Sequence, residues 1–235
     1  MKSKNDLCKM VSAAMNAYGL SNISTVDNGQ IGYPCMNIAM VLYHDYLEHI
    51  GRVCNHEFWD GTAVHCTMVA MTAVRIAAFV PEINLEKVHV LGLLHDYGGR
   101  YSEGNKELFH GTAGYEAMMI LGYTDVARVC LTHSFIHPAF RPEDYTYPAS
   151  EMIKARKLMD RIDLDDYDRL IQLSDSLVCG YLVVTAKDRL SALQKKYGIR
   201  QEAIGRKYQE IMALKSYFDE KCGRDVYEIL GINTK

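Results

Sequence analysis

The stretch VLGLLHDYGGRY, residues 90–101, places His95 and Asp96 at the end of an apolar run. An imidazole or carboxylate that faces a core needs hydrogen bonds or a metal ion, because burying it without a partner is costly. A second pair, His44 and Asp45, stands in VLYHDYLEHI, residues 41–50. The dipeptide alone says little about either place, so the surrounding residues have to distinguish the two pairs.

Apolar residues recur with the helical period of 3.6 along almost the whole chain, which has only five prolines. This pattern predicts an all-α fold class. Irregular stretches are expected at residues 19–34, 98–111 and 135–149. The last two are candidate rims of a site, because long loops in compact helical folds tend to carry function. Helices are expected at residues 5–18, 36–55, 62–79, 86–97, 112–121, 124–134, 150–160, 164–179, 186–197, 200–221 and 225–230.

Several residues at the ends of these segments have the side chains that helix termini prefer. Asn84 and Asp125 suit helix starts, because their side chains can accept hydrogen bonds from free backbone N–H groups. Gly122, Gly198 and Gly223 suit helix ends, where a left-handed residue often follows the last turn.

The composition indicates a globular protein with a large core. The chain has 235 residues, of which 49% are hydrophobic and 23% charged. A net charge of -3 and a pI near 6.3 give no sign of a nucleic-acid or anionic-membrane partner. The sequence has neither a signal-peptide core nor a run of 18 apolar residues, so we expect no secretion and no membrane span. Seven scattered cysteines without C-x-x-C fit reduced thiols in a cytoplasmic protein.

The helical pattern predicts that some polar residues face the core. His65 shares a helical face with Val69, Thr72 and Ile76, so it should point inward. On the next helix His95 follows Val88, Leu91 and Gly92 on one face, and the glycine would let a neighbouring helix approach closely. Asp175 lies on a stripe between Ile171 and Val178. Three polar residues of different helices are thus expected to face the interior.

Two interpretations of these residues stay open on the pattern alone. Each could be a buried side chain satisfied by a hydrogen bond or an ion pair, which is the commoner case for a single residue. Several that converge are better explained as metal ligands, since imidazole and carboxylate are groups that iron, manganese and zinc accept.

The ordered set HCTMVAMTAVRIA, LLHDYGG, FHGTAGYEAM, VCLTHSF and LIQLSDSL resembles the HD superfamily of metal-dependent phosphohydrolases. The resemblance covers about residues 60–190 and implies an HD-domain helical core with flanking helices. It implies a division into N-terminal helices at 1–59, the HD domain at 60–190 and C-terminal helices at 191–235. It also implies two divalent metals, iron, manganese or zinc, with magnesium and nickel as further candidates. The implied ligands are His65, His95, Asp96 and Asp175 for the first ion, and His110 and His133, with Asp96, for the second.

The resemblance also implies a chemistry and residues to carry it out. Asp96 could bridge two metals that hold a hydroxide nucleophile, so it is a candidate catalytic residue. Arg100 is a second candidate, for catalysis and for substrate binding, although relatives often place a cation three rather than four residues after the aspartate. The alternative is a solvated loop arginine. His137 is a further candidate, for contact with the substrate or with the second metal. Lys106 and Arg141, on the expected rim loops, are candidates for substrate binding, with solvated loop cations as the alternative.

Other polar segments are interpreted as ordinary surface. His44 and Asp45 have no histidine-bearing helix upstream, so we expect them on a helix surface. The acidic stretch DRIDLDDYD lacks the glycine and glutamate of a calcium loop and is interpreted as a helix start. The basic residues of 195–224 alternate with glutamates, as on an exposed helix. The apolar line of that helix should pack on the body or on a second copy of the chain, which would form a homodimer.

Three functions follow from these observations. The first is a hydrolase of a phosphorylated small molecule, specifically a nucleotide. The sequences around His110 and His133 are most similar to bacterial symmetrical diadenosine tetraphosphate hydrolases. The second is an HD-fold di-iron oxygenase, and the third is a nucleotide-binding regulator with a non-catalytic site.

Overall fold

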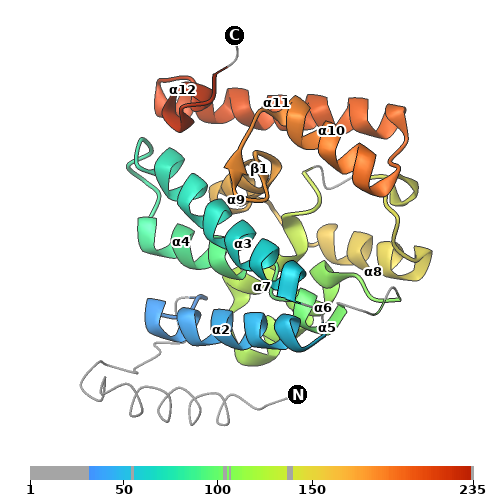
Figure 1. Ribbon diagram of the computed structural model, residues 1–235. Coiled ribbons are helices and arrows are strands. Elements are labelled where there is room, and N and C mark those ends of the chain that lie inside the picture. The colour runs from blue at the N-terminus through green and yellow to red at the C-terminus, as the bar shows by residue number, and fades with distance from the viewer. Residues whose placement is uncertain (1–31, 54–55, 103–104, 106, 137–139, 234–235) are drawn as a thin grey trace.

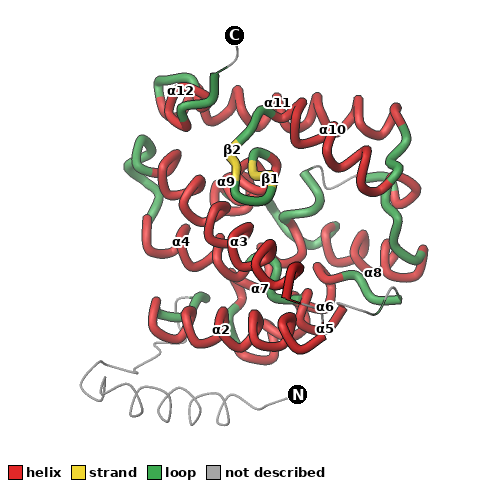
Figure 2. The backbone as a smooth tube through the Cα atoms, viewed as in Figure 1, coloured by secondary structure: helices red, strands yellow, loops and turns green. Residues whose placement is uncertain are grey.

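The computed structural model describes residues 32–53, 56–102, 105, 107–136 and 140–233. The predicted all-α class is confirmed: helices dominate, and the strands in the described part form one two-stranded sheet (Figure 2). The expected helix at 5–18 lies outside the described residues. The helices are α2 (Met36–Val53), α3 (His56–Ala77), α4 (Leu85–Leu94), α5 (Gly99–Ser102), α6 (His110–Leu121), α7 (Thr124–Thr132), α8 (Ala149–Met159), α9 (Asp166–Ser176), α10 (Ala186–Tyr197), α11 (Gln201–Cys222) and α12 (Val226–Leu230).

Helix ends follow the capping chemistry of the sequence. Asn84 caps α4 by accepting a hydrogen bond from the Lys87 N–H. Gly122, Gly198 and Gly223 end their helices in the left-handed conformation, as expected. Asp125 was expected to start a helix, but α7 begins at Thr124 and Asp125 lies in its first turn.

The acidic stretch before α9 is a helix start, as its sequence predicts. Asp165 accepts hydrogen bonds from the Tyr167 and Asp168 N–H groups, and the Asp168 carboxylate accepts one from the Asp165 N–H, which completes a capping box. Asp168 is buried, where it also receives hydrogen bonds from Arg128 and Thr132. The carboxylate is therefore part of the packing and not of a solvated face.

Helices α3 and α4 pack against each other in the middle of the molecule, with α2 below them and the C-terminal helices above in Figure 1. Gly92 permits this approach, as expected, because a Cβ atom built there would lie 2.5 Å from the Cα of Ala70. Val69, Ile76 and Leu91 are fully buried at this contact. The pair of helices forms a fixed frame for the side chains that they carry.

The structure differs from the sequence expectation in the segment that follows α4. The helix ends at Leu94, before the expected end at residue 97, and His95 is its C-cap residue. The short helix α5 then occupies part of the stretch 98–111 that was expected to be irregular. Gly98 lets the backbone pass close to the start of α6, since a Cβ atom at this position would lie 1.8 Å from the His110 carbonyl oxygen.

A second difference is the β-hairpin that follows α9. Strands β1 (Val178–Cys179) and β2 (Leu182–Val183) pair antiparallel where the sequence predicted helix up to residue 179. Gly180 turns the hairpin in the left-handed conformation, and the β-branched residues Val178 and Val183, which suit strands, pair across it. Of the other two expected loops, 135–149 contains a short 3-10 helix, η1 (Pro142–Asp144), and 19–34 lies largely outside the described residues.

The C-terminal helices α10 and α11 pack together and lie beside α9 (Figure 1). The apolar line of α11 packs on the body, where Ile204, Ile211 and Phe218 are buried. The expectation that the basic residues of this segment are exposed is wrong for Lys215, which is 5% exposed and pairs with Asp219 and Asp225. A homodimer stays a prediction. Within the described part of the chain, no helix has both the length and the apolar character needed to cross a membrane.

Candidate metal centre

The structure brings together all six residues that the resemblance implies as ligands, from five helices. His65 comes from the middle of α3, and His95 and Asp96 follow directly after α4. Asp175 lies near the end of α9. His110 is the first residue of α6 and His133 is the C-cap residue of α7. His95 and Asp96 thus stand at the C-terminal end of α4, where their side chains meet those of the other four helices.

The first group of ligand atoms surrounds one oxygen of Asp96. His65 Nε2 lies 3.0 Å from Asp175 Oδ1 and 3.8 Å from Asp96 Oδ2. His95 Nε2 lies 3.4 Å from the same Asp96 Oδ2. His65, His95 and Asp175 offer ligand atoms that all lie within 4.8 Å of one another.

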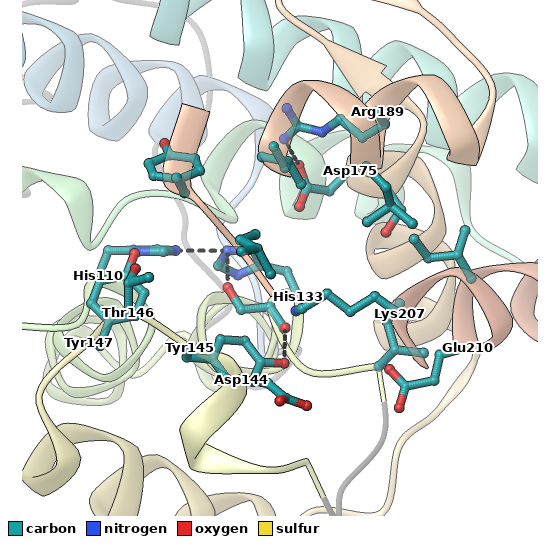
Figure 3. Close-up of a pocket in the computed structure, with 18 of the residues that line it drawn as sticks. His110, His133, Asp144, Tyr145, Thr146, Tyr147, Asp175, Arg189, Lys207 and Glu210 are labelled. Atoms are coloured by element: carbon teal, nitrogen blue, oxygen red, sulfur yellow. Dashed lines mark hydrogen bonds and ion pairs between the residues drawn. The ribbon is translucent and has the colours of Figure 1, made fainter. Parts of the chain in front are cut away.

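The second group surrounds the other oxygen of Asp96. His110 Nε2 and His133 Nε2 lie 3.5 and 3.3 Å from Asp96 Oδ1 and 3.0 Å from each other (Figure 3). Two nitrogens bound about 2.1 Å from one ion would lie roughly 3 Å apart, so this spacing fits a shared metal. Asp96 therefore turns one carboxylate oxygen toward each group.

Hydrogen bonds orient the imidazoles so that their Nε2 atoms face the cluster. His95 Nδ1 lies 2.7 Å from the Gly92 carbonyl and His133 Nδ1 lies 3.0 Å from the Val129 carbonyl. A carbonyl only accepts, so Nδ1 carries the hydrogen in both rings and leaves the Nε2 lone pair for a metal. Among the described residues, His95 Nε2 is buried without a hydrogen-bond partner. That nitrogen fits a metal ligand better than a satisfied core histidine.

A tyrosine holds the histidine at the rim of the cluster. Tyr147, in the loop after η1, places its hydroxyl 3.0 Å from His110 Nδ1. Phe109 packs against both rings, with centroids 4.8 Å from His110 and 4.7 Å from Tyr147. The second group is thus supported by a small aromatic core that includes Phe135, which stacks on Phe140 at 3.9 Å.

Burial and mutual charge displace the pKa values of the cluster. Burial alone would raise the pKa of Asp96, but His95, His133 and His110 outweigh it and hold that pKa well below its ordinary value. Burial would also raise the pKa of Asp175, but the hydrogen bond and charge of His65, together with the charges of Arg189 and His95, outweigh burial and lower that pKa. Both carboxylates therefore stay ionised at neutral pH, as metal ligands must be.

The imidazoles divide into two kinds. Burial lowers the pKa of His95, and it lowers the pKa of His110 to about 4. Burial alone would lower the pKa of His133, but the hydrogen bond with Asp96 and the charges of Asp96 and Asp175 together outweigh burial and raise that pKa. His95 and His110 are thus ready to bind a metal at neutral pH, whereas at His133 a metal would compete with a proton that Asp96 favours.

The cluster lies at one side of a cavity with a volume of about 290 Å³. A second wall is the segment from Asp144 to Tyr147, and a third is formed by α10 and α11. Arg189 and Lys207 extend from these two helices into the cavity (Figure 3). Because the cavity opens on both groups of candidate ligands, a small molecule bound in it could reach either metal.

The structure places the other candidate residues elsewhere. Arg100 forms an ion pair with Asp45 and does not line the cavity. It is therefore not the solvated loop arginine of the alternative interpretation, and Asp45 is not a simple surface residue. Arg141 is exposed where η1 begins. His137 and Lys106 lie outside the described residues, so their roles stay predictions.

Sequence reasoning missed the cations and aromatic residues of the cavity wall. Lys207 was assigned to an exposed face, although it lies three residues after Ile204 and four before Ile211, on their buried side. Arg189 has the same spacing from Ala186 and Leu193. A cation within an apolar helical stripe was the available signal. Tyr147 gave no comparable signal, because it lies in an irregular loop.

Comparison with known proteins agrees with this geometry. Residues 62–178, about half of the chain, match the family model of the HD domain, which supports membership of the HD superfamily. HD-domain proteins are generally metal-dependent phosphohydrolases. The chain has no significant match among curated proteins or among solved structures.

Proposed function

We propose that this chain, whose residues 62–178 match the HD domain, is a metal-dependent hydrolase of a phosphate ester or anhydride. The observation that carries the proposal is the position of Asp96. One of its oxygens lies among His65 and His95, and the other among His110 and His133. A carboxylate so placed can be shared by two cations, which is the arrangement that two-metal phosphohydrolysis needs.

The candidate ligands would form two metal sites that share Asp96. The bound metals would supply Lewis acidity to the phosphoryl oxygens and lower the pKa of a coordinated water. The chain itself holds the imidazoles in one tautomer and keeps Asp96 and Asp175 ionised. The first ion would be held by His65, His95, Asp96 and Asp175, and the second by Asp96, His110 and His133.

The cavity supports a nucleotide as substrate. Its volume of about 290 Å³ lies near the lower end of small-molecule sites, which start at about 300 Å³. Tyr145, Tyr147 and Tyr197 line it and offer aromatic surface to a base, while Arg189 and Lys207 offer charge to phosphates. A dinucleoside polyphosphate is the specific substrate that we propose, because of the sequences around His110 and His133.

The test is a hydrolysis screen of the protein loaded in turn with manganese, ferrous iron and zinc. The substrates are nucleoside monophosphates, which would release orthophosphate, and dinucleoside polyphosphates, which would release nucleotides. Each reaction is run with and without oxygen. We expect metal-dependent release that is the same in both atmospheres and is removed by a chelator.

The other two functions predict different results. An oxygenase would consume oxygen and would need reduced iron. A regulator would bind nucleotide without turnover, even with both metals in place. Either result would replace the hydrolase proposal.

A further inference from the structure

We propose that Arg189 and Lys207 together bind a phosphate group of the substrate beside the metal centre. The inference rests on the proposed hydrolase function and adds to it a binding subsite outside the HD match, on α10 and α11. Of the described residues that line the cavity, these two are the arginine and lysine members. Within the described part of the chain, these two side chains are therefore the positive charges of the cavity wall that a phosphate near the metals could bind.

Arg189 has donor capacity that the fold leaves unused. Its Nη2 lies 3.7 Å from Asp175 Oδ1, which is a loose ion pair. Its Nε is buried and has no hydrogen-bond partner within the part of the chain that the structure describes. A buried donor without an acceptor is costly, and a guanidinium presents its N–H groups in a fork that fits two phosphate oxygens. Arg189 lines the cavity, so a phosphate bound there would give this guanidinium a stronger anionic partner than the loose ion pair with Asp175.

Lys207 approaches the cavity from α11. Its ammonium nitrogen lies 4.1 Å from the ring centroid of Tyr145, which itself lines the cavity. Burial lowers the pKa of Lys207, although Glu210 and Asp144 act in the opposite direction. An ammonium group in such a place is stabilised by a further anion, so a phosphate would suit this side chain as well.

The neighbouring arginines of α11 are already engaged. Arg206 Nη2 lies 2.6 Å and Arg200 Nη2 3.3 Å from Asp144 Oδ1. These bonds fasten the helix to the segment that carries Tyr145 and Tyr147. They fix the wall from which Lys207 extends, and they leave Arg189 and Lys207 as the cations that face the cavity.

The experiment measures the binding of orthophosphate to the metal-loaded protein by calorimetry, with metal content determined for every sample. Arg189→Met and Lys207→Met should each weaken binding by about 10–100-fold, as expected for a lost charged hydrogen bond. Arg189→Lys should lose less than Arg189→Met. The matched controls are Lys187→Met and Lys195→Met on α10, where both lysines are exposed, and they should bind like the wild type.

Lys207→Met is the decisive variant, because Arg189 lies near a candidate metal ligand and its replacement could disturb metal loading. Unchanged phosphate affinity in Lys207→Met, with metals in place, would overturn the proposal, as would a wild type that binds no phosphate. Failure of the proposed function would give a different result. If the protein hydrolyses no phosphate compound but both variants lose phosphate affinity, the phosphate subsite is supported and the hydrolase proposal is overturned.

Discussion

Two His-Asp pairs in this chain have opposite surroundings. His44 is exposed on α2, and Asp45 is paired with Arg100. His95 is 1% exposed at the end of α4, and Asp96 faces imidazoles on both sides. The first pair has one cationic partner, whereas the second has several groups that can all donate electron pairs to a metal.

The difference shows that the neighbouring elements, and not the dipeptide, create the site. The pair at 44–45 lies within α2, where Asp45 meets the guanidinium of Arg100. The pair at 95–96 lies at the C-terminal end of α4, where α3, α6, α7 and α9 bring further ligands to it. The predictions below test this contrast, from the largest expected effect to the smallest.

Replacing the bridging carboxylate should have the largest effect. Asp96→Asn removes the negative charge between the two groups of imidazoles, so both metals should bind poorly. We expect hydrolysis to fall by more than about 100-fold, beyond the 10–100-fold typical of residues that only support a ligand. Steady-state hydrolysis and metal content would be measured together. A variant that retains both metals and full activity would contradict the bridging role.

Gly92→Ala should disturb the frame that sets His65 against His95. The added methyl would lie 2.5 Å from the Ala70 Cα, so α3 and α4 must separate. We expect a loss of about 1–3 kcal/mol in the free energy of unfolding, together with reduced metal content.

The control for this variant is Gly205→Ala in α11, where nothing lies within 4 Å of the added atom. That change should stabilise the protein by about 0.4–1 kcal/mol, because alanine restricts the unfolded chain. Equal behaviour of the two variants in urea unfolding would show that the close approach of α3 and α4 is unimportant.

Lowering the pH should decrease the free energy of unfolding of the metal-free protein, because of the histidines near Asp96. The pKa of His110 is lowered to about 4 and that of His95 is also lowered, so the unfolded chain binds protons between pH 6.5 and 4 that the folded chain does not. The free energy of unfolding should therefore fall by an amount on the order of 1–3 kcal/mol as pH decreases through this window.

His133 acts in the opposite sense at higher pH. Its raised pKa stabilises the fold below about pH 6.5, and this contribution is lost as pH rises through the folded value. Urea unfolding in a chelator, at half-unit intervals of pH, measures both effects. His110→Gln should flatten the acid side, and an unchanged slope in that variant would assign the effect to other groups.

Asp45→Asn should have the smallest effect on hydrolysis. It removes one partner of a largely buried ion pair, whose side chains are 16% and 18% exposed, so we expect a stability loss of about 1–3 kcal/mol. Hydrolysis should stay within about twofold of the wild type. A loss of activity comparable to that of Asp96→Asn would mean that the contrast between the two pairs is wrong.

The sequence predicts the helices well because its apolar period and its caps agree. The stripe through His65 and Ile76 and the close approach at Gly92 both follow from periodicity alone. The ending of α4 at Leu94 does not, because Tyr97 is apolar enough to continue the pattern. Nor does the pairing of Arg100 with Asp45, since it depends on how α2 lies against α5.

The cavity wall was harder to predict for a related reason. Arg189 and Lys207 lie on helices that were predicted with nearly correct ends, yet a charge on an amphipathic helix is usually solvated. Only the packing of α10 and α11 over the metal centre turns these side chains inward. The sequence thus located the helices, while their arrangement in space decides which charges reach the site.

The candidate ligands come from helices that lie far apart in the sequence, and this has a consequence for how the protein matures. Residues 65, 95 and 96 leave the ribosome well before Asp175, so the first metal position is incomplete until α9 has been made and has packed. A metal would therefore bind a chain that has already formed its long-range contacts. Once bound, it would stabilise that chain by mass action, by about 2.7 kcal/mol at a free concentration one hundred times the dissociation constant. The supply of metal would then contribute to the stability of this fold as well as to its proposed activity.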